Sequence, residues 1–556
     1  MRTLPALEGP EYARRQRAVG SRRSAVHLGG VAALTTLIAA IYSGFSLVLY
    51  GTYRESSYDL VTFDQAIRSY AHFHLGISII KGVHNGVGSN FSLLGDHFSP
   101  ILATLAPFYW IYDGPQTLLI AQAVLFALAI PPLWIFTRRA FGGSGWKATT
   151  AAYLICVAYG LSWPLASAAA FAFHEVAFAP VLTAIALERF QAGRLRSALI
   201  ALACLLLVKE DMGLLVAGIG VYLVVSLAPS VPRQRLVGIA LVVGGLAFTA
   251  FATYVLIPAF GGQAGQYWAY AGLGHNVPQV IGHITRHPVG SLQRMFRPAV
   301  KLHTMKWLLA VFCFLPLLSP LAVAALPLLV ERMLNSENPT WWGEHFHYNA
   351  YLVVILACAA VDGAARLDRW ATWAWRHATA RATPSADIPS ADTAPTDTAP
   401  ADTPPADTPP AGMLPGSSAR SVGTGVVAVG CCVAIAAATL YTLPRFALGQ
   451  ALHANFYSQT TRERAAAAAD AVVPSGVRVG AATDVAAELS GRDTVVQWNG
   501  ERPSLGSPWI VADVQRHVLN FPSVLAQSQD VALLSRSGYK IVFERDGYVV
   551  LHRASA

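Results

Sequence analysis

Charged residues are scarce in this sequence. Lys, Arg, Asp and Glu make up only 13% of its 556 residues, whereas 54% of the residues are hydrophobic. A soluble globular domain carries about 25% charged residues, so half that proportion does not cover a water-facing surface of this size. This scarcity argues against a soluble protein, a nucleic-acid binder and a disordered regulator. A membrane protein with many spans and some attached soluble mass remains.

Several common catalytic motifs are also missing. The sequence contains no His-Glu-x-x-His zinc motif, no glycine-rich phosphate loop and no Gly-x-Ser-x-Gly elbow. These absences argue against a metalloprotease, a nucleotide-driven pump and a serine hydrolase of the elbow type. The six cysteines all lie in apolar runs, which is typical of small buried hydrophobic residues rather than of disulfides or metal ligands.

What the sequence does contain is a series of long apolar runs. A transmembrane helix needs about 20 mostly apolar residues. On this basis we predict an all-α polytopic membrane protein with about eleven spans, of which the fifth and the two beside Pro320 are the shortest. The predicted spans are 27–50, 115–137, 148–165, 177–192, 197–209, 212–230, 236–258, 305–319, 320–334, 349–364 and 422–442.

The distribution of basic residues predicts the orientation of these spans. Lys and Arg collect in cytoplasmic loops, and the N-terminal tail 1–26 is rich in arginine. We therefore expect a protein of the cytoplasmic membrane with a cytoplasmic tail 1–26. A polytopic domain 27–365 follows, with a long first outside loop at 51–114. The outside loop 259–304 is basic as well and breaks the pattern.

Two further segments follow the polytopic domain. Residues 366–421 include a tract of Ala, Asp, Thr and Pro that predicts a disordered cytoplasmic linker before the last span, 422–442. Residues 443–556 predict a small extracytoplasmic α/β domain. Its expected strands are 477–481, 494–498, 509–514, 540–544 and 548–552, with a hairpin turn at Asp546–Gly547 and helices over 462–473 and 514–527.

Ionisable residues near membrane depth are expensive and mark functional sites, and here they concentrate on the outside. The first outside loop carries Asp59, Asp64 and Gln65, followed by Asp96 and His97. Asp59 and Asp64 are candidate reactive carboxylates, and Gln65, Asp96 and His97 are candidates for substrate binding. The alternative for Asp59 is a purely structural helix cap.

Other candidate substrate-binding residues also lie at predicted outer ends of spans. They are His174, Glu175, Lys209, Glu210, Asp211, Glu344, His345, His347 and Tyr348. A lysine–carboxylate pair with a structural role is the alternative for the 209–211 group. The histidines and carboxylates are compatible with a divalent cation but do not require one.

The basic outside loop offers a role in anion binding. Arg294 and Arg297 lie in it, and arginine favours phosphate oxygens. An outside pocket of Asp, His, Glu and Lys, with arginines nearby that can bind a phosphate group, suits a reaction on a lipid-linked substrate. The alternative is a transporter or flippase for a lipid-linked or anionic solute, although such proteins place polar groups nearer mid-membrane.

Several motifs in this order resemble one known group. They are Tyr58-Asp59-x4-Asp64-Gln65, Asp96-His97-Phe98-Ser99-Pro100, Phe173-His174-Glu175, Lys209-Glu210-Asp211 and the His347-Tyr348 region with its tryptophans. As a set they resemble the bacterial "domain of unknown function 2079" membrane proteins, over roughly 45–365 and more loosely over the tail domain. That family is similar in layout to the type C glycosyltransferase (GT-C) superfamily.

The resemblance implies a function at the outer face of the membrane. It implies transfer of a sugar from a polyprenyl-phosphate donor to an envelope glycan or lipid acceptor, with membrane lipids around the protein. No cofactor is certain from the sequence, and a divalent cation stays open. In that superfamily an early acidic residue of the first outside loop acts as general base. Asp59 matches that position, and Asp64 is its near rival.

Overall fold

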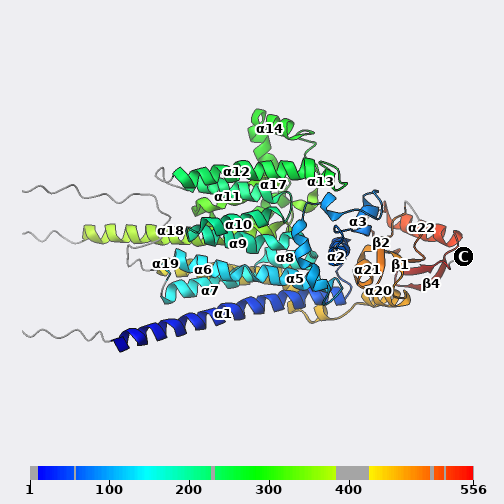
Figure 1. The fold of residues 1–556 in the computed structure, drawn as a ribbon, viewed down its shortest axis with the longest axis horizontal. Helices are drawn as coiled ribbons and strands as arrows, with labels where there is room; N and C mark the ends of the chain where they lie inside the picture. Colours follow the sequence, from blue (N-terminus) through cyan, green and yellow to red (C-terminus); the bar gives the residue numbers. More distant parts are fainter. Residues whose placement is uncertain are drawn as a thin grey trace, which may run out of the picture.

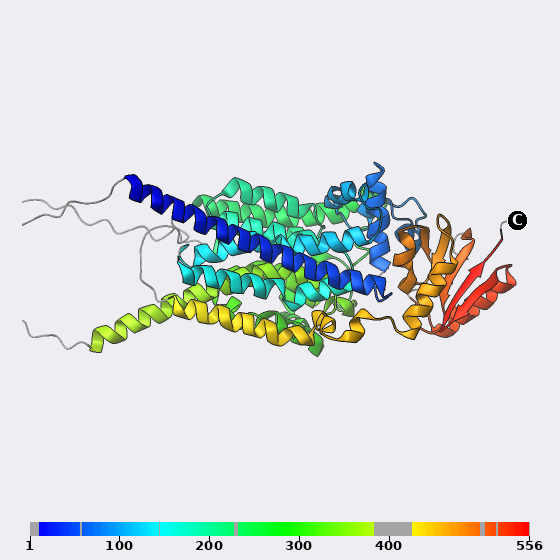
Figure 2. The same cartoon turned by 90° about the horizontal axis from the view of Figure 1, so that it is seen from below.

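The computed structural model describes residues 10–55, 58–143, 145–226, 232–382, 425–500, 506–518 and 521–554. A bundle of helices forms most of the molecule, and a small α/β domain sits on one end of it (Figure 1). The first residues of α1 (Pro10–Gly51), the end of α18 (Ala350–Ala382) and the start of α19 (Val426–Thr442) lie at the opposite end. A view from below shows the same separation of the two parts (Figure 2).

Six helical segments among the described residues are long and apolar enough to cross a membrane. Each corresponds to a predicted span, so the expected helical membrane architecture is confirmed. The other five predicted spans form shorter helices, and the predicted number of eleven is not established by the structure. The six segments are Ala25–Gly51, Gln116–Ala140, Trp146–Phe171, Gln234–Ala259, His347–Ala378 and Val426–Arg445.

Proline explains where two of these segments are interrupted. Proline is tolerated in the first turn of a helix but not in its interior. Pro131 and Pro132 open α6 (Ile130–Ala140) after α5 (Gln116–Ala127). Pro164 opens α8 (Trp163–Phe171) after α7 (Trp146–Gly160). The other bundle helices are α9 (Phe178–Gln191), α10 (Leu195–Leu206), α11 (Met212–Ser226), α12 (Pro232–Phe251), α13 (Ile257–Ala259), α16 (Ala299–Ala310) and α17 (Leu326–Leu334).

The last helix before the predicted linker is longer than expected. We placed its end at residue 364 and a disordered linker over 366–421, but α18 continues to Ala382. Residues 366–382 contain neither Gly nor Pro and are rich in helix-forming Ala and Arg. The next proline is Pro384. The remainder of the predicted linker lies outside the described residues.

The loop 51–114, which we predicted to lie outside, folds into a layer of short helices on the end of the bundle. It contains α2 (Tyr58–Ala71), α3 (Ile79–His84) and α4 (Ala106–Tyr109). Further along the chain, α14 (Val277–Arg286) and α15 (Pro288–Phe296) project from the side of the bundle (Figure 1). This projection holds most of the basic loop away from the layer formed by α2 and α3.

The C-terminal domain contains a five-stranded sheet in the order β2-β1-β3-β5-β4. β1 pairs in parallel with both β2 and β3, whereas β5 is antiparallel to β3 and β4. The expected strands are present, and Asp546 and Gly547 form the β4–β5 turn with positive φ. The strands are β1 (Arg478–Ala481), β2 (Thr494–Gln497), β3 (Trp509–Asp513), β4 (Lys540–Arg545) and β5 (Tyr548–His552).

The helices of this domain were predicted less well. α20 (Thr461–Val472) matches the expected helix, but the helix predicted over 514–527 is wrong, because α22 runs from Val524 to Arg536. Pro522 precedes this helix, and the Ser523 hydroxyl accepts a hydrogen bond from Ala526 N as its N-cap. The eight-residue helix α21 (Thr483–Ser490) was missed.

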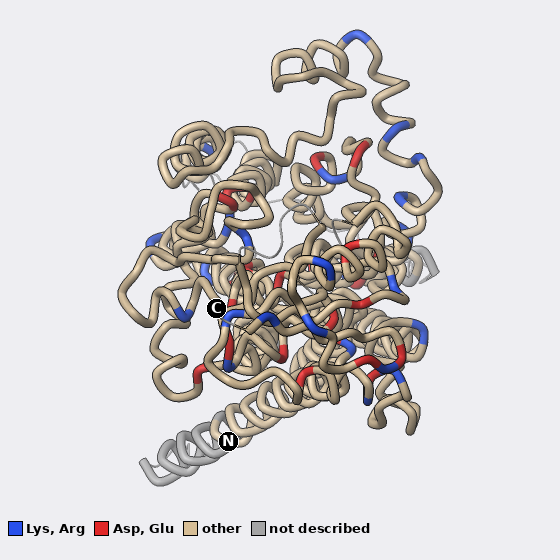
Figure 3. The backbone as a smooth tube through the Cα atoms, turned by 90° about the vertical axis from the view of Figure 1, so that its right-hand side faces the viewer, with Lys and Arg blue, Asp and Glu red and all other residues tan. Residues whose placement is uncertain are grey.

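Polar contacts fix the C-terminal domain to the layer beneath it. Arg54, just after α1, forms an ion pair with Glu463 of α20 at 2.9 Å. The Gln65 amide of α2 donates to the Val495 carbonyl at 2.7 Å, and its oxygen accepts from Ile80 N at 2.9 Å. Gln65 therefore holds α2, α3 and β2 together. Charged positions of both signs are visible from this end of the molecule (Figure 3).

Candidate active site

A cavity of about 640 Å³ lies between the helical bundle and the C-terminal domain. Its volume falls within the range of small-molecule sites, which is about 300–1,000 Å³. Eight of the residues predicted from the sequence line this one cavity, although they come from five separate stretches of the chain. They are Asp59, Asp96, His97, His174, Glu175, Lys209, His347 and Tyr348.

Asp59 lies in the first turn of α2 and faces the cavity. Its side chain is 37% exposed, and its Oδ2 lies 3.5 Å from Nε2 of His174. Burial by itself raises the pKa of Asp59, but the contact and charge of His174, with Lys81 and His97 further away, lower the pKa below its usual value. The carboxylate is thus ionised at neutral pH, and it has an acidic residue's favourable position at a helix N-terminus.

Asp64 occupies a different environment from Asp59. Its side chain is fully buried, accepts hydrogen bonds from both terminal nitrogens of Arg68 at 2.7 and 3.1 Å, and accepts another from the Tyr109 hydroxyl at 2.8 Å. Burial raises the pKa of Asp64, and Arg68 partly offsets that rise. Asp64 and its neighbour Gln65 do not line the cavity. Their contacts join α2 to α4 and to the C-terminal domain.

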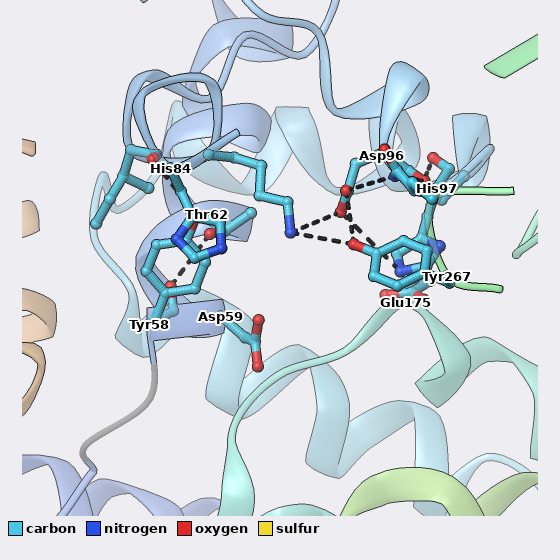
Figure 4. Close-up of polar contacts among 12 residues, drawn as sticks. Tyr58, Asp59, Thr62, His84, Asp96, His97, Glu175 and Tyr267 are labelled. Atoms are coloured by element: carbon cyan, nitrogen blue, oxygen red, sulfur yellow. Dashed lines mark hydrogen bonds and ion pairs between the residues drawn. The ribbon is translucent and has the colours of Figure 1, made fainter. Parts of the chain in front are cut away.

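A buried lysine that sequence analysis missed lies across the cavity from Asp59. Lys81 Nζ is 3.1 Å from Asp96 Oδ2 and donates to the Tyr267 hydroxyl at 3.2 Å. The Tyr267 hydroxyl donates to Asp96 Oδ1 at 2.7 Å, which closes a triangle of contacts (Figure 4). Burial raises the pKa of Asp96, but His97 and Lys81 lower it further than burial raises it.

His97 is held between an aromatic ring and a carboxylate. Its ring stacks on Tyr267 with centroids 4.7 Å apart, and its Nδ1 lies 2.7 Å from Glu210 Oε1. Glu210 also accepts the Phe98 N–H at 3.1 Å. Burial and Lys209 lower the pKa of His97, but Glu210 and Asp96 raise it above its ordinary value. Glu210 itself lies behind the cavity wall, where it orients His97.

The 209–211 turn supplies charge compensation to the cavity. Lys209 Nζ lies 3.2 Å from Oε1 of Glu175, whose side chain is almost completely buried. Glu210 and Asp211 do not line the cavity, and burial raises the pKa of Asp211 to about 6. Lys209 therefore does form a lysine–carboxylate pair, the structural alternative given above, and its partner is Glu175. Both residues of this pair are also part of the cavity wall.

Two histidines form a stacked pair in the wall beside Asp59. The rings of His174 and His347 are 3.7 Å apart between centroids and 22° from parallel. Phe171 stacks on both rings, with centroids 5.2 Å from His174 and 5.9 Å from His347. Both Nδ1 atoms are buried, with no hydrogen-bond partner among the described residues. In proteins, buried polar atoms of this kind are usually satisfied by a protein group or an ordered water.

Four other predicted site residues lie elsewhere. Arg294 and Arg297 are on and just after α15, outside the cavity, because the basic loop forms the projecting α14–α15 hairpin. Glu344 Oε1 lies 2.6 Å from His303 Nδ1, and His345 is exposed. The cations that the bundle side contributes to the cavity wall are instead Lys81 and Lys209, and the C-terminal domain contributes Arg516.

The chain was compared with known proteins. The model of the family described as "Predicted membrane protein (DUF2079)" matches residues 53–383. The chain belongs to this family. None of the curated proteins matches it. A crystal structure of ArnT from Cupriavidus metallidurans in the apo state has 14% sequence identity and a TM-score of 0.43, and the alignment covers 91% of this chain and 96% of that one.

The DUF2079 match covers the membrane half of the cavity but not its other half. Residues of the C-terminal domain complete the wall, and no sequence motif marked them. They are Thr483, Asp484, Asp513, Arg516, His517 and Val518. Within the described part of the chain, no group of three or more His, Cys, Asp and Glu side chains is arranged to hold a metal ion.

Proposed function

We propose that this protein is an integral membrane glycosyltransferase that moves a sugar from a polyprenyl-phosphate donor to an acceptor outside the cytoplasmic membrane. The observation that carries the proposal is Asp59, an ionised carboxylate in a cavity at the end of a membrane bundle, beside His174 and across from Lys81. A general base must be ionised and within reach of the proton that it removes.

In the proposed reaction Asp59 takes the proton of the acceptor hydroxyl as its oxygen attacks the anomeric carbon. The bond between the anomeric carbon and the phosphate oxygen breaks, and its electron pair remains on the leaving polyprenyl phosphate. Lys81 and Lys209 stabilise that phosphate by charge. Because the reaction is one displacement, the anomeric configuration inverts.

Asp59 is favoured over Asp64 for this role by their environments. Asp64 has both oxygens engaged by Arg68 and Tyr109 and lies outside the cavity. The cavity wall also contains several aromatic rings, including Tyr58 and Tyr348, which suit the apolar faces of sugar rings.

The test is transfer of labelled sugar in proteoliposomes that contain a panel of polyprenyl-phosphate hexoses and pentoses with cell-envelope acceptors. We expect Asp59→Asn to lower the rate by roughly 100- to 10,000-fold, the usual contribution of a general base, with unchanged thermal stability. Equal rates in the wild type and Asp59→Asn would contradict the role of Asp59. Movement of a solute across sealed vesicles without any sugar transfer would favour the transporter instead.

A further inference from the structure

The carboxyl ends of two parallel strands of the C-terminal sheet open into the cavity. β1 lies between β2 and β3 and is parallel to both. From β1 the chain turns through α21 toward β2, whereas from β3 it leaves through α22 toward β4 and β5 on the other side. Open α/β sheets bind ligands at such a divergence, in the crevice beyond the carboxyl ends of the strands.

The side chains at this divergence lie in the cavity wall. Thr483 and Asp484 follow β1, and Asp513, Arg516 and His517 end or follow β3. The crevice of the sheet and the cavity of the membrane bundle are therefore one continuous space, with Asp59 in the wall contributed by the bundle and these residues in the wall contributed by the sheet.

Two polar atoms at this edge lack an internal partner. Thr483 Oγ1 and Asp484 Oδ1 are both buried without a hydrogen bond among the described residues. The other oxygen of Asp484 accepts from the Tyr548 hydroxyl and from Arg462 Nη2 at 3.4 Å. Hydrogen bonds to Oδ2 thus fix the position of the Asp484 side chain, whereas Oδ1 has no hydrogen-bond donor among the described residues. An unsatisfied buried polar atom costs free energy that a ligand recovers.

Hydrogen bonds within the C-terminal domain also hold the loop after β3 in one conformation before any ligand binds. The Gln527 amide of α22 donates to the carbonyls of Asp513 and Arg516, and its oxygen accepts from Val518 N at 3.0 Å. Asp513 Oδ1 accepts the N–H groups of Gln515 and Arg516 at 2.8 and 3.1 Å. A prearranged loop binds with a smaller loss of entropy than a mobile one.

We propose that this edge of the sheet is a carbohydrate subsite that holds a sugar acceptor against Asp59. The proposal rests on the proposed function and deepens it by choosing a glycan acceptor over a lipid acceptor. The hydroxyl of Thr483 and the free oxygen of Asp484 match the hydrogen-bonding groups of sugars, and the domain lies on the end of the bundle rather than against its apolar sides (Figure 2).

The test uses the full-length protein in detergent and saturation-transfer NMR with soluble gluco-, manno-, galacto- and arabino-oligosaccharides. The variants are Thr483→Val and Arg516→Gln. The matched controls are Thr494→Val and Arg536→Gln, at exposed positions that do not line this cavity. We expect at least one oligosaccharide to bind the wild type, and Thr483→Val and Arg516→Gln each to bind it roughly tenfold more weakly, the loss of about one hydrogen bond. The controls should bind as the wild type does.

Two outcomes would overturn the subsite. One is binding by the variants that equals that of the wild type, and the other is no binding of any oligosaccharide to the wild type. These outcomes are separate from a failure of the proposed function. Normal sugar transfer by Asp59→Asn would exclude Asp59 as the general base, but it would not change the comparison of oligosaccharide binding between the wild type and the Thr483→Val and Arg516→Gln variants.

Discussion

Nε2 of His174 lies 3.5 Å from Oδ2 of Asp59, so a residue from the end of one membrane segment contacts the first helix of the loop 51–114. Phe171 and His347 both stack on the His174 ring and on each other, so the three rings pack as one cluster that fixes the position of His174. His174 is therefore a positioning residue for Asp59, and its contact and charge help to keep Asp59 ionised.

Replacing His174 should change the pH dependence of transfer. His174→Phe removes a contact and a charge that lower the pKa of Asp59, so that pKa should rise. Asp59 would then be protonated at higher pH, and the acidic limb of the pH–rate profile should move upward. The profile of sugar transfer measures this shift. His72→Phe, outside this cavity, is the control, and an unmoved limb in His174→Phe would contradict the positioning role.

Asp64 should contribute to stability rather than to chemistry. Asp64→Asn removes the buried carboxylate that accepts hydrogen bonds from Arg68 and Tyr109, whereas Arg68 keeps its ion pair with Asp113 at 2.6 Å, so we expect a loss of about 1–3 kcal/mol. We expect a thermal unfolding midpoint several degrees below that of the wild type, with sugar transfer retained at temperatures where the variant is folded. Asp59→Asn, at the neighbouring acid of the same helix, should show the opposite pattern. Loss of transfer in folded Asp64→Asn would make Asp64 the base.

Lys81 should affect the donor more than the acceptor. Lys81→Gln keeps a polar side chain of similar length but removes the cation that faces the leaving phosphate. We expect kcat/KM for the donor to fall by about 100-fold, within the range reported for loss of one charge-stabilising group. Steady-state kinetics with varied donor measure the effect, and Lys306→Gln, at an exposed position on α16, is the matched control. An unchanged kcat/KM would exclude Lys81 as a phosphate ligand.

The His97–Glu210 pair should stabilise the protein in a defined pH window. The pKa of His97 is raised, so its contribution is fully present below its unfolded value and is lost as the pH rises through the folded value. The pKa of Glu210 is lowered to about 2, so its contribution is present above the ordinary glutamate value and is lost only in strong acid. Glu210→Gln should therefore lower the unfolding midpoint more at pH 6 than at pH 9. An equal difference at both values would contradict the pairing.

The patterns of apolar and charged residues predicted most of the local structure and part of the candidate site. The apolar runs located the long helices, and β-branched alternation located the strands of the C-terminal sheet. Asp59, His97, His174 and Lys209 were selected because charge near membrane depth is costly, and the structure brings them into one cavity. The decision between Asp59 and Asp64 needed the fold, because only the contacts with Arg68 and Tyr109 distinguish their environments.

The errors have a common physical origin in long-range packing. Arg294 and Arg297 were chosen for their charge, but the projecting hairpin carries them away from the cavity. Lys81 and Tyr267 were missed because neither has a local motif. The one available signal was a lysine between the apolar residues of 79–83, where burial requires a partner. Thr483 and Asp484 could be recognised as cavity residues only from the fold, which places the C-terminal sheet over the end of the bundle.

The division of the cavity between two parts of the chain has a consequence for its assembly. A ribosome makes residues 59–348, which supply the bundle side, long before residues 483–518, which supply the other side. The C-terminal domain covers Asp59 and Lys81 only after its sheet has folded. It must also form its contacts with Arg54 and Gln65. The order of synthesis therefore delays completion of the site until the membrane helices have been made, so an unfinished chain has no complete cavity.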